Sequence, residues 1–102
     1  MAQQPELEQL KATLAELQIL LRAEGVFQKH AFLFRRCFDL ITWADTEPEA
    51  VEALKDYLSG MPNAPGTLRD LVIWRDAYQA RKQINQRLDS LRERMFELAG
   101  NL

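Results

Sequence analysis

The sequence predicts an all-α fold, a four-helix antiparallel bundle with a long C-terminal helix. Apolar residues recur three and four positions apart along most of the chain, no stretch keeps the two-residue alternation of a strand, and Gly and Pro fall mainly between the periodic stretches. The 102 residues, 47% of them hydrophobic, suffice for one modest core. We therefore expect residues 1–102 to form a single helical domain, in which short loops favour packing between sequence neighbours.

The first helix is predicted over residues 5–24. Pro5 suits an initial turn, because its missing N–H has no partner there, and Gly25 is a natural terminator. A seam of leucines repeats with heptad-like spacing and must lie against another helix. The seam consists of Leu7, Leu10, Leu14, Leu17 and Leu21.

The second helix is predicted over residues 27–44. Its apolar arc is wide and includes Phe32 and Trp43, which indicates a central helix with more than one neighbour. A third, short helix is predicted over residues 47–59. Thr46 and Glu49 have the spacing of a capping box, with Pro48 tolerated in the first turn.

The last helix is predicted to begin after Thr67 and to continue to Ala99. The loop Gly60–Gly66 precedes it, and Thr67 with Asp70 forms a second capping box, which favours helix over strand for the β-branched run at Val72. Such a helix would be about 48 Å long and the first one about 30 Å, so it should overhang, bend or pack on a second copy. Its seam, the expected mate of the leucine seam, is Ile84, Leu88, Leu91, Met95 and Leu98.

Charge and composition exclude several partner classes. The formal net charge is −2, and the basic residues of the last helix alternate with acidic ones, so no patch predicts nucleic-acid binding. No apolar run approaches the roughly 20 residues that span a bilayer, and the polar N-terminus lacks the pattern of a secretory signal. With Cys37 as the single cysteine, a reducing compartment fits best. We expect a cytoplasmic protein without a membrane partner.

Residues that could do chemistry are few, and no catalytic residue, cofactor or metal is predicted. His30 and Cys37 could share a helix face, but two ligands do not complete a zinc site, and a buried Cys37 is the better interpretation. The Gly60–Gly66 loop could cradle a phosphate, but it lacks the Gly spacing and the Lys of a phosphate-binding loop, so a simple connector is favoured. We therefore do not expect an enzyme.

Acidic residues cluster between the second and third helices. They carry about three net negative charges from Glu47 to Asp56 once Lys55 is counted. Acids are stabilised at a helix start, so a solvated surface is one interpretation, and recognition of a basic partner is the other. The aromatic residues could anchor a partner or belong to the core. The predicted partner-binding residues are Asp45, Glu47, Glu49, Glu52, Asp56, Tyr57, Met61, Asn63 and Trp74.

Two segments together resemble a group of small helical bacterial immunity proteins, which are encoded beside secreted antibacterial toxins. One is Leu20-Leu21-Arg22-Ala23-Glu24-Gly25-Val26 with the apolar helix that follows it. The other is Gly60-Met61 followed by Gly66-Thr67-Leu68-Arg69-Asp70-Leu71-Val72-Ile73. The chain departs from the group's Gly-Gly-Met-Gly-Ser-Leu-Asn-Asp-Leu turn by inserting residues 62–65, by Thr67 in place of Ser and by Arg69 in place of Asn.

This resemblance implies a cytoplasmic protein that binds and neutralises a cognate toxin, and it brings no catalytic residues. The alternative is a self-associating adaptor or structural protein, with a homodimer formed through the long C-terminal helix. An enzyme is the third and weakest class. A measurement of the oligomeric state distinguishes the immunity protein from the self-associating adaptor only in part, because an immunity protein can also be a dimer.

Overall fold

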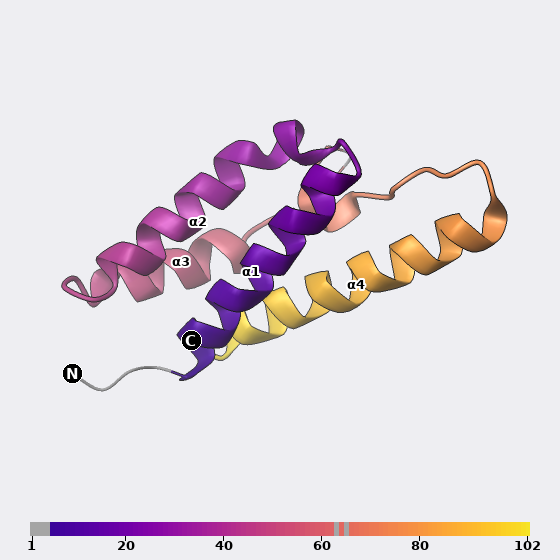
Figure 1. Ribbon diagram of the computed structural model, residues 1–102. Coiled ribbons are helices and arrows are strands. Elements are labelled where there is room, and N and C mark those ends of the chain that lie inside the picture. The colour runs from indigo at the N-terminus through magenta and orange to yellow at the C-terminus, as the bar shows by residue number, and fades with distance from the viewer. Residues whose placement is uncertain (1–4, 63, 65) are drawn as a thin grey trace.

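The computed structural model describes residues 5–62, 64 and 66–102 (Figure 1). Within these residues the chain forms four α-helices and no strand, which confirms the predicted all-α bundle with a long C-terminal helix. The elements in order are α1 (Pro5–Ala23), the short 3₁₀ helix η1 (Phe27–His30), α2 (Ala31–Trp43), α3 (Glu49–Ser59), a second 3₁₀ helix η2 (Leu68–Asp70) and α4 (Tyr78–Gly100).

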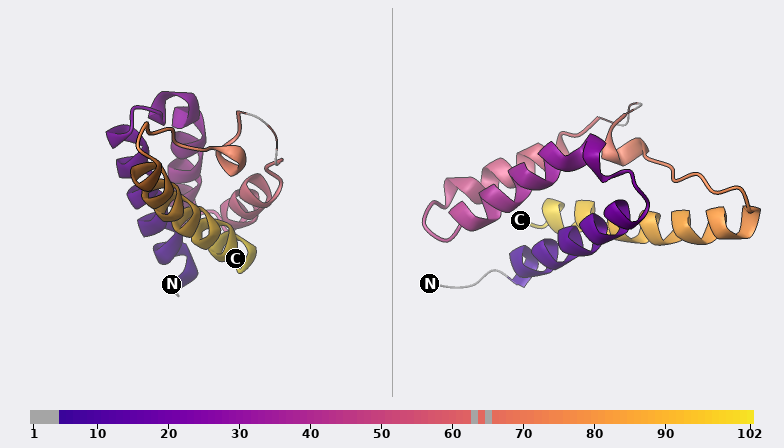
Figure 2. Two further views of the ribbon diagram at one scale, coloured as in Figure 1. Left: turned by 90° about the vertical axis from the view of Figure 1, so that its right-hand side faces the viewer. Right: turned by 45° about the horizontal axis from the view of Figure 1, so that its top comes forward.

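The helices are arranged as two antiparallel pairs, α1 against α4 and α2 against α3, and α3 also packs on α4 (Figures 1 and 2). Each helix runs roughly opposite to the one before it, with short turns between the first three helices and the longer connection 60–77 before α4. The molecule is elongated, with extents of 48 × 23 × 20 Å. The length comes from α4, whose N-terminal part extends beyond the rest of the bundle (Figure 2).

The two predicted seams form the centre of the core. The five leucines of the α1 seam are buried, and so are Leu88, Leu91, Met95 and Leu98 of α4, while Ile84 is partly buried at the edge. Phe34 and Cys37 of α2 and Leu54 and Leu58 of α3 complete the same cluster. The α4 seam is therefore occupied within the chain, which leaves other surfaces for any contact with a second copy.

The end of α1 follows the prediction. Gly25 has a positive φ of 74°, which glycine adopts without steric cost. The N–H of Gly25 donates to the Arg22 carbonyl and that of Val26 to the Leu21 carbonyl, at 3.2 and 3.0 Å. This is the Schellman pattern, which satisfies carbonyls left free at a helix end.

The second and third helices differ from the prediction at their starts. Residues 27–30 form η1 rather than the first turn of an α-helix. The capping box at α3 is wrong, because the Thr46 hydroxyl donates to the carbonyl of Trp43 at 3.4 Å and Pro48 precedes the helix without a side-chain cap. The backbone N–H of Ala50 instead donates to the Glu47 carbonyl at 2.9 Å, so the turn before α3 supplies the acceptor that a side-chain cap would have supplied.

The predicted start of the last helix is also wrong. Only η2 follows Thr67, residues 71–77 are not helical, and α4 begins at Tyr78. The Thr67 hydroxyl does not cap a helix but lies 3.1 and 2.8 Å from the carbonyls of Pro62 and Ala64, toward which it donates. Residues 71–77 run as an extended segment beside α4 in the opposite direction (Figure 1).

Side chains of α4 hold this extended segment by its backbone. The Asn85 carboxamide accepts from the N–H of Ile73 and donates to the Ile73 carbonyl, both at 2.8 Å. About two turns further along the helix, Arg92 donates to the carbonyls of Leu68 and Leu71 at 3.0 and 2.7 Å. These distant side chains satisfy backbone groups that a helix would have satisfied locally, and the buried Ile73 side chain adds apolar contact.

The segment is also tied to α1. The Arg75 guanidinium lies 2.5 Å from the carboxylate of Glu24, whose side chain is only 9% exposed. Residues 71–87, which we call the arm, thus comprise the extended segment and the N-terminal part of α4. In that part of α4, no residue before Leu88 is fully buried.

Candidate protein-binding surface

A pocket of about 520 Å³ lies between the start of α2, the end of α3 and the loop that leads to η2. The loop reaches this position because Gly60 ends α3 and Gly66 turns the chain with a φ of 89°. The lining residues are Lys29, His30, Phe32, Leu33, Asp56, Tyr57, Gly60, Met61, Pro62, Gly66, Thr67 and Leu68.

The pocket has an apolar interior and a charged rim. Phe32 is 72% exposed although it is a large aromatic side chain, and Tyr57 and Met61 are partly buried beside it. Lys29 and Asp56 contribute one charge of each sign. This combination of an apolar depression with a few polar groups is typical of sites that receive a side chain or a small ligand.

The loop side of the pocket is held by Arg69. Its Nε donates to the Met61 carbonyl at 2.9 Å, and its guanidinium stacks over the Phe96 ring at 3.9 Å from the centroid. Arg69 therefore ties the end of α3 to α4, and the Thr67 hydroxyl braces the same loop from within. The pocket wall is thus fixed by side-chain bonds that span different elements.

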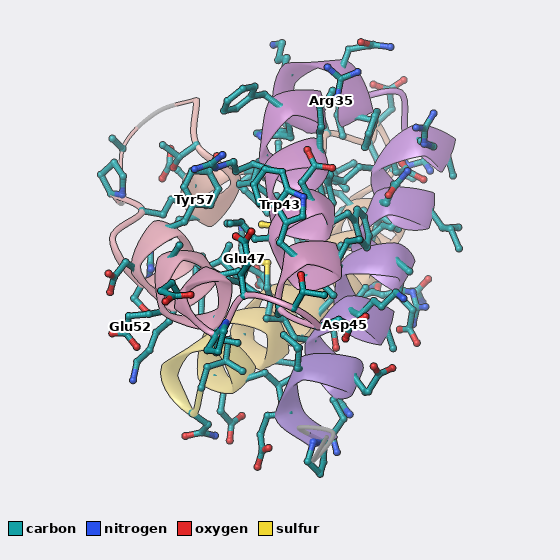
Figure 3. The ribbon with its side chains drawn as sticks, turned by 90° about the vertical axis from the view of Figure 1, so that its left-hand side faces the viewer. Arg35, Trp43, Asp45, Glu47, Glu52 and Tyr57 are labelled. Atoms are coloured by element: carbon teal, nitrogen blue, oxygen red, sulfur yellow. The ribbon has the colours of Figure 1, made fainter. Side chains whose placement is uncertain are left out.

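An acidic face adjoins the pocket. Asp45, Glu47, Glu49, Glu52 and Asp56 are all exposed, and they extend from the α2–α3 turn along α3 to the pocket rim. Figure 3 shows Asp45 and Glu47 in the α2–α3 turn, Glu52 on α3 and Trp43 at the end of α2, whereas Tyr57 is on the last turn of α3, where it lines the pocket. We call these five carboxylates together with the pocket the α3 surface.

Titratable groups at the pocket respond mainly to burial. Burial raises the pKa of the Tyr57 phenol, and Cys37 nearby raises it further against the opposing effect of Arg36. Burial also lowers the pKa of His30, and the charge of Lys29 acts in the same direction. At neutral pH the pocket therefore presents a neutral phenol and a neutral imidazole, both suited to hydrogen bonding rather than to charge pairing.

The structure brings together most of the residues that the sequence singled out, with two exceptions. The five carboxylates, Tyr57 and Met61 belong to the α3 surface. Asn63 lies outside the described residues. Trp74 is in the extended segment, at the end of the molecule opposite to the α2–α3 turn, where its Nε1 donates to Asp76 at 3.3 Å and Arg81 stacks over its ring (Figures 1 and 2).

Sequence reasoning missed Lys29 and Phe32, which line the pocket, and left open whether Trp43 anchors a partner or belongs to the core. Phe32 and Trp43 were assigned to the wide apolar arc of the second helix, yet they are 72% and 47% exposed. The width of that apolar arc could have predicted this exposure, because two neighbouring helices cannot cover so broad a stripe. The residues left over at its margins are the ones that face solvent.

The two residues considered as metal ligands, His30 and Cys37, are both buried. Cys37 is buried in the core, as expected, and burial raises the pKa of its thiol to about 12, which makes it a poor nucleophile. Among the described residues, no three His, Cys, Asp or Glu side chains are grouped so that they could hold a metal ion. A phosphate site at the Gly60–Gly66 loop would need a helix that begins at Thr67. Only the three-residue η2 follows Thr67, and α4 begins at Tyr78.

Comparisons with known proteins do not place the chain in a family: no protein-family model, no curated protein and no solved structure matches it. Across residues 5–62, 64 and 66–102, none of the helices has the length and hydrophobicity needed to cross a membrane.

Proposed function

We propose that this chain is an immunity-type protein that binds a cognate bacterial toxin in the cytoplasm and neutralises it through the α3 surface. One observation carries the proposal. Of the stretch that resembles immunity proteins, Gly60-Met61 followed by Gly66 to Ile73, the first part (Gly60, Met61 and Gly66 to Leu68) lines the pocket beside the acidic face. The resemblance and the pocket thus share five residues.

The geometry suits a protein ligand. A partner side chain that enters beside Phe32, Tyr57 and Met61 would bury apolar surface at the centre of the contact, where interface energy is concentrated. The exposed carboxylates around it would steer a basic surface toward the pocket and raise the association rate. The mechanism is steric, because the chain covers the active site of the toxin or blocks its substrate. It needs no cofactor and no catalytic step.

The proposal is tested with the product of the neighbouring reading frame as the partner. We expect that this product, expressed alone in a bacterial host, stops growth, and that co-expression of the chain restores growth and yields a complex that co-purifies at low salt. A host that grows equally poorly with and without the chain, together with no complex between the purified proteins by calorimetry, would falsify the proposal.

A further inference from the structure

The His30 imidazole lies in the wall of the pocket and has no hydrogen-bond partner among the described residues. Only 5% of the residue is exposed, and neither ring nitrogen bonds to another described side chain or backbone group. In the described residues that are not exposed, no fully buried side-chain nitrogen or oxygen lacks a partner. The His30 nitrogens therefore keep some contact with solvent, and the surface that His30 lines is the pocket. Polar groups this deeply buried are normally paired, so the imidazole has bonding capacity left for a ligand.

The pocket is charged at its mouth and apolar on the way to His30. Phe32 is 72% exposed, and Lys29 and Asp56 are exposed beside it, which places these three at the mouth. Leu68 and His30 are 1% and 5% exposed, which places them in the interior. A ligand that reaches the imidazole must therefore have an apolar body and carry its polar group at the tip. A short polar side chain would not fill the apolar part.

The chemistry of the imidazole selects the group at that tip. A neutral imidazole has one donor and one acceptor nitrogen, and a hydroxyl can pair with either because it both accepts and donates. Lys29 and Asp56 at the mouth have opposite charges, so together they favour neither a cationic nor an anionic tip. A cationic tip would also meet an imidazole that burial and Lys29 keep neutral by lowering its pKa, and a carboxylate would have to pass the acidic face.

We propose that the pocket binds a tyrosine side chain of the protein partner, with its hydroxyl hydrogen-bonded to His30 and its ring between Phe32 and Met61. The identification of that partner as a toxin rests on the proposed function, and the inference adds the chemistry of the contact. Tyrosine combines a rigid apolar ring with a hydroxyl at its tip, and it is enriched in protein interfaces. Its ring would cover part of the exposed Phe32 side chain, which gains aromatic packing as well as burial.

The test is an NMR titration of the free chain with p-cresol, the side-chain analogue of tyrosine, and with toluene, which lacks the hydroxyl. p-Cresol is added to roughly 20 mM, where a ligand of this size should bind measurably. His30 is the only histidine, so its two imidazole nitrogen resonances are identified directly in long-range proton–nitrogen spectra. We expect p-cresol to shift these resonances and the amides of residues 56–61, and to bind roughly fivefold tighter than toluene.

His30→Leu should reverse this preference, because the hydroxyl of p-cresol would then be desolvated without a partner. Gln28→Ala is the control, since Gln28 is an exposed residue of the same 3₁₀ helix that does not line the pocket, and it should keep the preference for p-cresol. Circular dichroism checks that both variants are folded. The nitrogen resonances of the wild-type chain provide the answer even if His30→Leu does not fold.

Three results with the wild-type chain would overturn the inference: no binding of p-cresol, tighter binding of toluene, or p-cresol binding that leaves the His30 nitrogens unshifted. The product of the neighbouring reading frame should shift the same nitrogens in the same direction when it forms a complex. A complex without that shift overturns the inference and leaves the toxin-binding function standing. Binding of p-cresol without any complex supports the chemistry of the pocket and counts against the proposed function, so the two failures are distinguishable.

Discussion

Reversing two charges of the α3 surface, Glu49→Lys with Glu52→Lys, is expected to weaken toxin binding by on the order of tenfold at low salt. Both carboxylates are exposed in the first turn of α3, and Asp56, one turn after Glu52 on the same helix, lines the pocket. The loss should lie mainly in the association rate and shrink as salt is added, because screening weakens long-range attraction. Surface plasmon resonance at two ionic strengths measures both effects.

The chain provides a closely matched control for this double reversal. Glu6 and Glu8 occupy the first turn of α1, so Glu6→Lys with Glu8→Lys changes the net charge equally and loses the same kind of favourable helix-dipole interaction. The control should bind nearly as the wild type does. Equal weakening by the two variants would mean that net charge alone matters, and that the acidic face of α3 has no specific role in recognition.

Replacing Asn85 by Ala is expected to release the extended segment from α4. The substitution removes both partners of the Ile73 backbone, and Ile73 is only 2% exposed. Either two buried polar groups remain unpaired, or the segment detaches and the Ile73 side chain loses its burial. Each route lowers the free energy of unfolding by about 2 to 4 kcal/mol. Urea denaturation measures this loss, and rapid exchange of the Ile73 amide would locate it.

Gln86→Ala is the control for that experiment, because Gln86 is the exposed neighbour of Asn85 on the same helix. Alanine there should change stability by less than about 0.5 kcal/mol. An Asn85→Ala protein as stable as this control, with the Ile73 amide still protected, would show that Asn85 does not hold the segment.

The sequence predicted the helical parts of the fold because their causes are local. The three- and four-residue spacing of leucines in α1 and of apolar residues in α4 is visible in the chain, and both seams are buried as expected. Gly25 ends α1 through a motif that depends only on adjacent residues. Such periodic and terminal signals survive folding when nothing distant competes with them.

The extended segment could not be predicted in the same way, because its cause is distant in the chain. Thr67 and Asp70 have the spacing of a capping box, but the Thr67 hydroxyl binds carbonyls of the preceding loop instead. Asn85 and Arg92 then supply hydrogen-bond partners for backbone groups that lie 12 to 24 residues earlier. Tertiary hydrogen bonds of this range override a local helix signal.

The candidate site shows the same division. The acidic cluster was visible because its members are close in sequence, whereas the pocket needed three separate elements to meet. Lys29 of η1 and Phe32 of α2 line the site together with Gly60–Pro62 and Gly66–Leu68, residues that are about 30 positions away in the sequence. Trp74 was grouped with that loop by proximity in sequence, and the extended segment carries it to the other end of the molecule.

The most direct test of the proposed toxin-binding role is hydrogen–deuterium exchange of the chain with and without the product of the neighbouring reading frame. We expect exchange to slow at Lys29–Leu33 and at Asp56–Met61, which line the pocket, and to stay unchanged in the extended segment 71–77. Slowing confined to the arm, or no slowing anywhere at saturating partner, would contradict the assignment of toxin binding to the α3 surface.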